Sequence, residues 1–294
     1  MPLTLRSPCK VNFVLNLLGR RPDGFHELET LFFPVAAFDE LTLDLSEPGI
    51  TLTCSHPDLP VDASNLVHRA ATAFLRAAPL EGRTGVRIHL DKRLPLSAGI
   101  GAGSANAAVT LLGLNELLGH PLAPADLDRL AAGLGSDVNF FLQPGPALAF
   151  GRGERIEPLP PFTALKGHAL LLFHPGFGVA TPWAFRELAR FPQLRDGQPG
   201  RAAAAARRFL DGDVPGGVDQ WFNALEGPVL EKHPILALHQ ESLRNQGALG
   251  ARMSGSGSTT FALFASEAAA RMAGGAFRQA FGDAGWLHVV PLDV

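Results

Sequence analysis

The sequence predicts an α/β fold of the mixed α+β kind, divided into two domains. Strand-like and helix-like segments alternate through the first half, where a glycine-rich loop at 95–106 joins a strand to a helix. A proline cluster at 158–162 cannot continue a helix or a central strand, and an apolar strand at 169–173 opens the second half. The 294 residues are 46% hydrophobic, which is enough for two domains. We therefore expect domains at 1–157 and 158–294.

Composition argues against several classes of protein. The net charge of -3 disfavours nucleic acid or an anionic membrane as the main partner. The N-terminal residues lack the apolar region of a signal peptide, and no apolar run reaches the roughly 18 residues of a membrane span, so we expect a cytoplasmic protein. Cys9 and Cys54 lack metal-ligand spacing and are predicted to be reduced thiols. Neither H-E-x-x-H nor G-x-S-x-G occurs, which disfavours metalloenzymes and serine hydrolases.

The first element is an apolar strand over 9–16. Side chains alternate across a strand, so one face carries Cys9, Val11, Phe13 and Leu15, and the other carries Lys10, Asn12, Val14 and Asn16. Two interpretations stay open for the polar face. It belongs to an edge strand in contact with water, or it is a catalytic face where Lys10 acts beside Asn12. The scarcity of lysine, with only 4 in the chain, favours the second.

A turn at 19–28 follows this strand and presents two residues of interest, Phe25 and His26. An aromatic ring followed by a side chain that both donates and accepts hydrogen bonds is suited to stacking on a base and contacting its edge. Taken singly, Phe25 is better explained by a core position, and His26 by a surface position.

The glycine-rich loop is the most informative element. It follows a half-buried strand in which Val86, Ile88 and Leu90 alternate with polar residues, and it precedes a helix that ends at Gly119, with Ser104 as its expected cap. Glycines at every second position let the backbone approach an anion, and the helix start supplies N–H donors. The residues predicted to bind the triphosphate of ATP are Pro95, Leu96, Ser97, Ala98, Gly99, Ile100, Gly101, Ala102, Gly103, Ser104 and Ala105.

Two familiar phosphate loops do not match this stretch. A P-loop requires Gly-Lys-Ser/Thr, and no lysine lies between Lys92 and Lys166. A dinucleotide fingerprint requires a third glycine where Ser104 or Asn106 stands. A glycine-rich turn without a ligand would be the default interpretation of this loop on its own.

A carboxylate follows the next helix. Leu127, Leu130 and Leu134 predict an amphipathic helix that ends at Gly135, and Asp137 begins the following turn. An acid at this position is more often a helix cap than a catalyst. If it instead faces Lys10 beneath the phosphate loop, it can orient or deprotonate a hydroxyl that attacks the γ-phosphate.

The second half contains a second glycine loop. Met253 is followed by residues 254–258, which alternate serine and glycine and lead into an apolar strand at 259–264. Between them and the strand at 169–173, residues 191–217 mix Asp, Gly and Pro around a helix at 201–210. We expect 191–217 to be a surface segment without a role in a site.

These residues together resemble the superfamily of galactokinase, homoserine kinase, mevalonate kinase and phosphomevalonate kinase. Three blocks carry the resemblance: 10–33 with its Arg-Pro-Asp-Gly-Phe-His-Glu run, 95–108, and 253–264. Residues 134–141 and 151–154 are also similar, so the resemblance covers nearly the whole chain. The first block is typical of a branch of the superfamily whose acceptor is a cytidyl diphosphate sugar alcohol.

The resemblance implies ATP-dependent phosphorylation of the 2-hydroxyl of that alcohol, in the non-mevalonate route to isoprenoid precursors. It implies Asp137 as the base, Lys10 as its partner and Asn12 as a ligand of the substrate hydroxyl. Mg²⁺ is expected with ATP, carried on the phosphates, because no dedicated metal ligand is evident. Other small alcohols, or nucleotide binding without catalysis, remain as alternatives.

The remaining site residues also come from the resemblance. Phe25, where the family often has tyrosine, would stack on cytosine, and His26 would contact its edge. Phe185 and Thr181 would complete the substrate site, and Asn65 would meet adenine. The implied fold pairs an N-terminal domain similar to ribosomal protein S5 domain 2 with a ferredoxin-like C-terminal domain. We expect a monomer or weak homodimer with small-molecule partners only.

Overall fold

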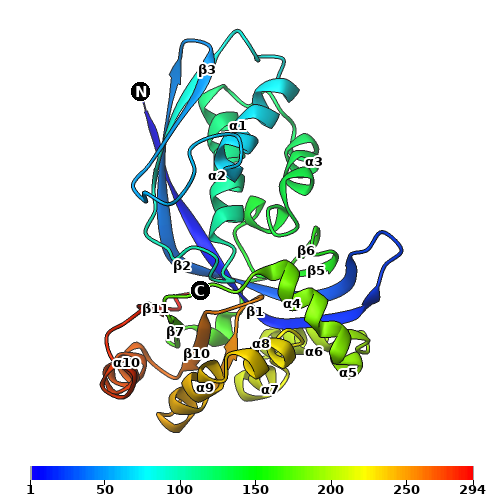
Figure 1. Ribbon diagram of the computed structural model, residues 1–294, viewed down its shortest axis with the longest axis vertical. Helices are drawn as coiled ribbons and strands as arrows, with labels where there is room; N and C mark the ends of the chain where they lie inside the picture. Colours follow the sequence, from blue (N-terminus) through cyan, green and yellow to red (C-terminus); the bar gives the residue numbers. More distant parts are fainter. Residues whose placement is uncertain (1, 294) are drawn as a thin grey trace. The chain divides into compact units, whose positions relative to one another are not determined.

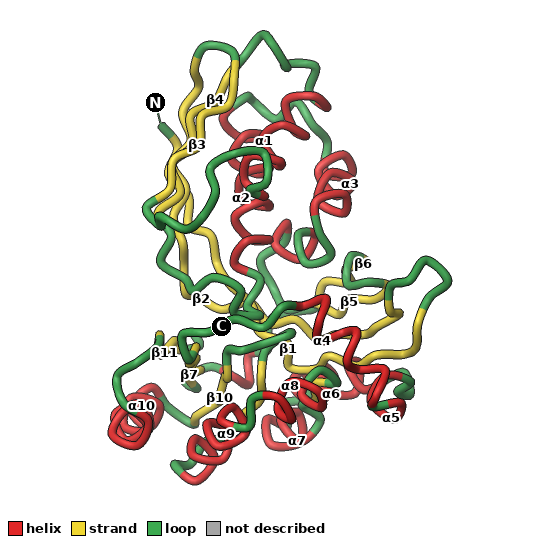
Figure 2. The backbone as a smooth tube through the Cα atoms, in the orientation of Figure 1, coloured by secondary structure: helices red, strands yellow, loops and turns green. Residues whose placement is uncertain are grey.

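The computed structural model describes residues 2–293 (Figures 1 and 2). They form two compact units, each assembled from separate parts of the sequence. Unit 1 takes the chain up to Cys9, Ala36–Leu94 and Gly101–Pro144, and unit 2 takes Lys10–Val35, Pro95–Ile100 and the chain from Gly145 onward. This division differs from the predicted boundary at 157/158. The long strands β1 (Leu3–Arg20) and β2 (His26–Ser46) each contribute to both units, so no single cut in the sequence separates them.

Unit 1 is a sheet with helices on one face (Figure 1). Strand β3 (Gly49–Cys54) runs parallel to β4 (Gly85–Asp91), which pairs antiparallel with residues 40–46 of β2. In β4 the predicted alternation is confirmed, because Val86, Ile88 and Leu90 are buried and the residues between them are exposed. The other elements of unit 1 are α1 (Leu66–Ala77), α2 (Ala102–Leu117), α3 (Pro124–Leu134) and the 3-10 turn η1 (Asn139–Leu142).

Helix α2 follows the glycine loop, as predicted, but its start differs. It begins at Ala102 with Gly101 as N-cap, so the expectation that Ser104 caps it is wrong. Gly101 has φ +69°, which only glycine adopts freely, and this turns the chain directly into the helix. About three helical turns further on, α2 packs closely on the sheet. A Cβ at Gly113 would lie 2.6 Å from the Leu5 side chain, so a larger residue there would require that side chain to shift.

The first sheet region of unit 2 surrounds residues 10–20 of β1. Strand β8 (Phe222–Asn223) pairs parallel with Val14 and Leu15, while β5 (Ala147–Gly151) pairs antiparallel with β2 and continues into the hairpin strand β6 (Arg155–Pro158). Aromatic rings fill the space beside β1. The Phe13 ring stacks on Phe33 at 4.8 Å and on Trp221 at 4.7 Å between ring centroids. The apolar face predicted for this strand is therefore confirmed as core.

A second sheet of unit 2 has the order β11-β7-β10-β9, with every neighbour antiparallel. Its strands are β7 (Ala169–His174), β9 (Gly250–Met253), β10 (Thr260–Phe264) and β11 (Trp286–Pro291), and α9 (Ile235–Asn245) and α10 (Glu267–Phe281) pack against it. This βαββαβ order is the ferredoxin-like pattern that was predicted. The other helices are α4 (Thr181–Glu187), α5 (Pro192–Arg195), α6 (Arg201–Leu210), α7 (Val214–Asp219) and α8 (Glu226–Lys232), with 3-10 turns η2 (Thr163–Leu165) and η3 (Leu188–Arg190).

Two simple sequence expectations can be compared with the structure. Cys9 and Cys54 are thiols, as predicted, with Cys9 fully buried and Cys54 partly so. No helix within residues 2–293 has the length and apolar character needed to cross a bilayer.

Burial of His239 makes the stability of unit 2 sensitive to pH. The imidazole on α9 packs among the rings of Phe173, Phe277 and Phe281, at centroid distances of 4.9, 5.3 and 4.8 Å. Its Nδ1 has no hydrogen-bond partner among residues 2–293. Removal from water disfavours the charged ring and lowers the pKa of His239 to about 4.

We expect this histidine to weaken the fold in mild acid. Between the ordinary pKa of 6.5 and the folded-state pKa of about 4, the unfolded chain binds a proton that the folded chain does not. The free energy of unfolding should therefore fall by up to about 3 kcal/mol across this window. His239→Phe keeps an aromatic ring but cannot bind a proton. In urea denaturation, its free energy of unfolding should therefore fall less between pH 7.5 and pH 4.5 than that of the unaltered protein. An identical pH dependence in both proteins would show that His239 does not titrate in this way.

Candidate active site

The polar face of β1 lies inside the protein. Lys10, Asn12 and Asn16 are only 3%, 2% and 2% exposed. The alternative of an edge strand in contact with water is therefore wrong, because β8 pairs with β1 and the side chains of both faces are covered. Burying this many polar groups is unfavourable unless each is hydrogen-bonded, so their partners define the site.

Lys10 connects β1 to the glycine loop within unit 2. Its Nζ donates to Oδ1 of Asn12 at 2.7 Å and to the carbonyl of Gly99 at 3.3 Å, and it stands 5.1 Å from the centroid of the Phe32 ring. The backbone N–H of Lys10 also donates to the carbonyl of Ile100 at 2.9 Å. The ammonium is thus held against the middle of the predicted phosphate loop.

Asn12 extends this hydrogen-bond network from β1 to Thr30 on β2. Its Nδ2 donates to Oγ1 of Thr30 at 2.8 Å, and Thr30 donates in turn to the carbonyl of Val14 at 2.5 Å. With Oδ1 accepting from Lys10, both ends of the Asn12 amide are engaged. The amide is therefore fixed in orientation, which is what a residue that positions a substrate hydroxyl needs.

Asn16 and Glu29 continue the buried polar face. Nδ2 of Asn16 donates to Oε1 of Glu29 at 2.9 Å and to the carbonyl of Gln198 at 2.8 Å. Glu29 accepts from the backbone N–H groups of Gly200 and Ala202 at 2.8 and 3.2 Å, at the start of α6. Part of the segment 191–217 is therefore anchored to the polar face of β1 and β2, which corrects the expectation of a surface segment apart from the site.

The two glycine loops touch through their backbones. The carbonyl of Gly99 accepts from Oγ of Ser254 at 3.0 Å, and the N–H of Thr259 donates to the carbonyl of Ala98 at 3.2 Å. Gly99 has φ +76°, and a Cβ there would lie 2.2 Å from the Ser254 carbonyl oxygen. Nδ2 of Asn223 clamps the second loop by donating to the carbonyls of Met253 and Gly255 at 2.7 and 2.8 Å. Only glycine at position 99 allows this contact.

In unit 1, Asp39 holds the chain on both sides of the predicted phosphate loop. Its fully buried carboxylate accepts from the N–H of Arg93 and of Leu94 at 2.8 Å each, just before the loop. It also accepts from Nζ of Lys92 at 2.5 Å and from Nδ2 of Asn106 in α2 at 3.0 Å. One carboxylate thus fixes the residues that enter the loop and the helix that leaves it.

Asp137 and Asn65 also belong to unit 1. Asp137 is partly exposed in the turn between α3 and η1, after the helix end at Gly135 that the sequence predicts. Asn65 is the N-cap of α1, where its Oδ1 accepts from the N–H of Val67 at 2.9 Å and its Nδ2 donates to the carbonyl of Pro60 at 2.6 Å. The predicted roles of Asp137 as base and Asn65 at adenine stay predictions.

The predicted base-binding residues lie together in unit 2. His26 begins β2, and its ring is 5.3 Å from that of Phe185 on α4. Phe25, at the end of the preceding turn, is 51% exposed, so a core position for it is excluded. Burial is the largest cause that lowers the pKa of His26 below its usual value. The guanidinium groups of Arg20 and Arg195 lower this pKa further, whereas the Asp196 carboxylate raises it. The ring is therefore neutral at pH 7 and offers both a donor and an acceptor.

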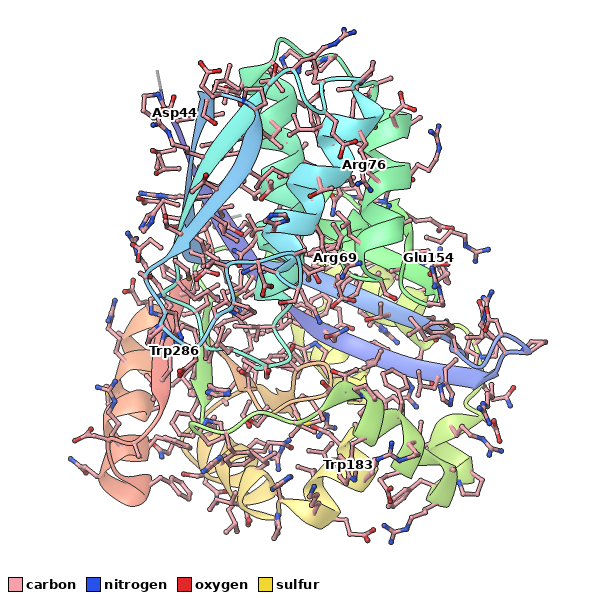
Figure 3. All side chains as sticks on the ribbon, turned by 45° about the horizontal axis from the view of Figure 1, so that its top comes forward. Asp44, Arg69, Arg76, Glu154, Trp183 and Trp286 are labelled. Carbon is pink, nitrogen blue, oxygen red and sulfur yellow. The ribbon has the colours of Figure 1, made fainter. Side chains whose placement is uncertain are left out.

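Helix α4 connects these residues to the second glycine loop. Thr181, its first residue, is exposed and shares a hydrogen bond with Oγ of Ser256 at 2.8 Å. Trp183, labelled in Figure 3, lies under Nζ of Lys232 on α8, which stands 4.1 Å from the centroid of its ring. The helix is thus fixed at its start and along its side, and it presents Phe185 toward His26.

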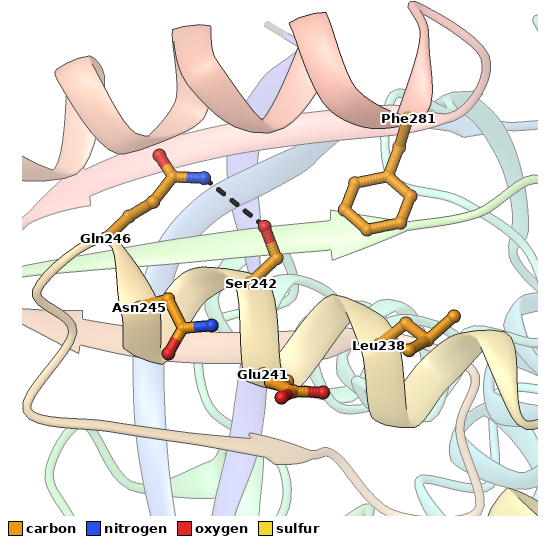
Figure 4. Close-up of a pocket in the computed structure, with 6 residues that line it drawn as sticks. All are labelled: Leu238, Glu241, Ser242, Asn245, Gln246 and Phe281. Atoms are coloured by element: carbon orange, nitrogen blue, oxygen red, sulfur yellow. Dashed lines mark hydrogen bonds between the residues drawn. The ribbon is translucent and has the colours of Figure 1, made fainter.

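A hollow elsewhere on unit 2 does not suit a phosphorylated substrate. It lies on α9 beside the end of α10, and Leu238, Glu241, Ser242, Asn245, Gln246 and Phe281 line it (Figure 4). The lining includes a carboxylate and no cation, so it would repel an anion. For metals, no group of three or more His, Cys, Asp or Glu side chains that could bind an ion occurs in the described chain.

The two buried acids, Asp39 and Glu29, were missed at the level of sequence. Asp39 follows the apolar run 35–38 of β2, whereas Glu29 lies among polar residues near the start of the strand. A carboxylate after an apolar run is rarely buried unless it is paired, so this placement is a signal for Asp39, and Glu29 has no such signal. Their partners are far away in the sequence and have no local pattern.

The chain matches two family models and several curated relatives. Residues 65–145 match the family model of the GHMP kinases N terminal domain, and residues 192–283 match that of the GHMP kinases C terminal. The 4-diphosphocytidyl-2-C-methyl-D-erythritol kinase of Acaryochloris marina is 40% identical, covering 92% of this chain and 89% of the relative. The enzyme of the same name from Citrifermentans bemidjiense is 38% identical over 95% of this chain and 96% of the relative.

Solved structures agree with these matches. The crystal structure of a 4-(cytidine 5'-diphospho)-2C-methyl-D-erythritol kinase superposes with a TM-score of 0.80 at 35% identity, covering 99% of this chain and all of the other. The homoserine kinase of Cytophaga hutchinsonii gives a TM-score of 0.73 at 22% identity, over 99% and 95% of the two chains. At that identity the second match shows a shared fold alone.

The close contact at Gly99 generates a prediction with a matched control. Gly119 has the same φ of +76° but open space where a Cβ would stand. Gly119→Ala should lower the free energy of unfolding by about 1–2 kcal/mol through backbone strain alone. Gly99→Ala should cost roughly 1–3 kcal/mol more, because the new Cβ overlaps the second glycine loop. Urea denaturation of both variants measures the difference, and equal losses would argue against the loop contact.

Proposed function

The chain belongs to the 4-diphosphocytidyl-2-C-methyl-D-erythritol kinases, a branch of the GHMP kinases, and we propose that it transfers the γ-phosphate of ATP to the 2-hydroxyl of 4-diphosphocytidyl-2-C-methyl-D-erythritol. This reaction lies on the non-mevalonate route to isoprenoid precursors. The observation that carries the proposal is the buried polar face of β1, where Lys10 reaches the carbonyl of Gly99 in the phosphate loop. An ammonium is held there beside an oriented amide, as transfer of a charged group requires.

In the proposed mechanism, two side chains act on the attacking hydroxyl. Asp137 accepts its proton while the oxygen forms a bond to the γ-phosphorus, and the bond between that phosphorus and the bridging oxygen of ADP breaks. Lys10 stabilises the negative charge that develops on the hydroxyl and phosphoryl oxygens, and Asn12 holds the hydroxyl. The fixed hydrogen bonds of Lys10 and Asn12 support these roles, because both groups are positioned before substrate arrives.

The proposed cytidine site consists of Phe25, His26 and Phe185. Phe25 is exposed and free of the core, so its ring is available for stacking on the base. The neutral His26 beside Phe185 is suited to a base edge that both donates and accepts. Thr181 would contact the substrate from the start of α4. These features favour a nucleoside substrate over homoserine or mevalonate, which offer no ring to stack on.

For the phosphate donor, we propose that residues 95–105 and the start of α2 bind the triphosphate of ATP, with Asn65 near adenine. Positive φ at Gly99 and Gly101 and the helix N-terminus favour close approach of an anion to backbone N–H groups. We propose that Mg²⁺ enters with ATP and is carried by its phosphates, whose charge it neutralises. The oligomeric state, a monomer or weak homodimer, stays a prediction.

The proposed function is tested by coupled measurement of ADP release. With Mg²⁺ and ATP, release should depend on 4-diphosphocytidyl-2-C-methyl-D-erythritol and should be absent with homoserine or mevalonate. Turnover of homoserine or mevalonate instead would assign the chain to another branch of the superfamily. ATP binding without ADP release for any of the three alcohols would favour a non-catalytic nucleotide-binding protein.

Asp137→Asn tests the assigned base. The amide keeps the size of the side chain but cannot accept the proton, so kcat should fall by about 10²–10⁴-fold. The Kd of ATP, measured by calorimetry, should change by less than about twofold, because the base acts chiefly in the transition state. Asp126→Asn on α3 is a matched control and should leave kcat unchanged. A large loss of ATP affinity in Asp137→Asn would mean that Asp137 binds the nucleotide instead.

A further inference from the structure

The Gly151-Arg152-Gly153-Glu154 turn resembles the family, but the proposed mechanism assigns it no role. It joins β5 to β6 in unit 2, and its guanidinium lies over an aromatic ring. The central carbon of the Arg152 guanidinium is 4.9 Å from the centroid of the Phe25 ring, which is within the range of a cation–π contact. Phe25 is the ring proposed to stack on cytosine. The turn therefore touches the proposed cytidine site through one side chain.

Sheet register explains why these two residues meet. β5 runs antiparallel to β2, and Gly151 pairs with Leu28. The residue after Gly151 therefore lies beside the start of β2, where the turn that carries Phe25 ends. The contact between Arg152 and Phe25 follows from the pairing of two strands and does not require a flexible loop to fold over the pocket.

Glu154 holds Arg152 in place. Its Oε2 accepts from the backbone N–H of Arg152 at 2.7 Å, and its Oε1 lies 3.6 Å from the side-chain Nε. Gly151 and Gly153 have φ of +74° and +111°, and a Cβ at Gly151 would be 3.1 Å from the Glu154 carboxylate. The two glycines thus form a tight turn that wraps around this carboxylate. Arg152 leaves the turn with its backbone fixed and its guanidinium paired.

Phe25 lacks any comparable support of its own. Its backbone is fixed, since its carbonyl accepts from the N–H of Arg21 at 2.8 Å and its N–H donates to Oδ1 of Asp23 at 3.1 Å. Its ring, however, is half exposed and has no polar group with which to anchor itself. The guanidinium over one face limits the ring to fewer orientations and leaves the other face for a base.

We propose that Arg152 is a positioning residue for base recognition, which rests on the proposed function in which Phe25 stacks on cytosine. Its guanidinium covers one face of Phe25 and holds the ring ready for stacking, and Glu154 holds the guanidinium. The cost of ordering an exposed ring is met before substrate binds, so affinity for the base rises. The alternative role for a cation at this position is direct contact with the substrate diphosphate.

The experiment compares Arg152→Gln with Arg155→Gln. The second variant removes an exposed arginine from the same hairpin. Arg155 lies 5.6 Å over the Phe150 ring and has no assigned role in substrate binding. Arg152→Gln should raise the KM for the cytidyl substrate and the Kd of cytidine by about three- to tenfold. The value of kcat and the KM for ATP should change by less than about twofold. Arg155→Gln should change none of these.

A double-mutant cycle separates positioning from direct contact. In a Phe25→Leu background, Arg152→Gln should have no further effect on the Kd of cytidine, because the ring that it positions is gone. Circular dichroism of each variant confirms that it is folded. The inference is overturned if Arg152→Gln leaves the Kd of cytidine unchanged, or if its effect persists undiminished in the Phe25→Leu background. Weaker binding of CDP without weaker binding of cytidine would identify a phosphate contact instead.

Failure of this inference is distinguishable from failure of the proposed function. If the unaltered protein releases no ADP with the cytidyl substrate, the proposed function fails, whatever the Arg152 variants do. If that protein is active and binds cytidine while Arg152→Gln behaves like Arg155→Gln, the positioning role alone is rejected.

Discussion

The close approach of two glycine loops at Gly99 is the constraint on which the organisation of unit 2 depends. The carbonyl of Gly99 accepts from both Lys10 and Ser254, and only a residue without a Cβ leaves room for the Ser254 carbonyl beside it. This one peptide group connects the strand that carries the ammonium, the loop proposed to bind ATP and the loop that enters β10. Displacing any one of the three would move the others, because interiors packed at crystal-like density have no space to absorb the shift.

A buried polar face extends from this point along β1. Lys10, Asn12 and Asn16 all bury groups that water would otherwise solvate, and each is satisfied by a named partner. Such a network is less stabilising than an apolar face of the same size, because the polar groups must first be desolvated. The network lies where the phosphoryl acceptor is proposed to be oriented. Through Glu29, the same network anchors the start of α6.

The proposed selectivity for a nucleoside substrate comes from aromatic side chains near the start of β2. The rings of His26 and Phe185 lie next to each other. Phe25 precedes His26 in the chain and is exposed, with the Arg152 guanidinium over its ring. Curated relatives and solved structures with the name of the cytidyl kinase cover nearly the whole chain, whereas the homoserine kinase shares the fold at lower identity. The fold is thus common to kinases of several alcohols. We propose that specificity resides in these side chains.

Sequence alone determined the local conformations and, through its motifs, the family. Alternation of apolar and polar residues predicts the strand at 86–90, and helical periodicity predicts the helix after the loop. The loop between them follows from its glycines, of which Gly99 and Gly101 have positive φ. All three signals are properties of neighbouring residues. Only the tertiary structure decided that the Lys10 face is buried, that Asp39 holds both sides of the loop and that Arg152 meets Phe25. These contacts join residues far apart in the chain. Their existence depends on strand register and on which elements cover each face, and no local pattern of residues encodes either.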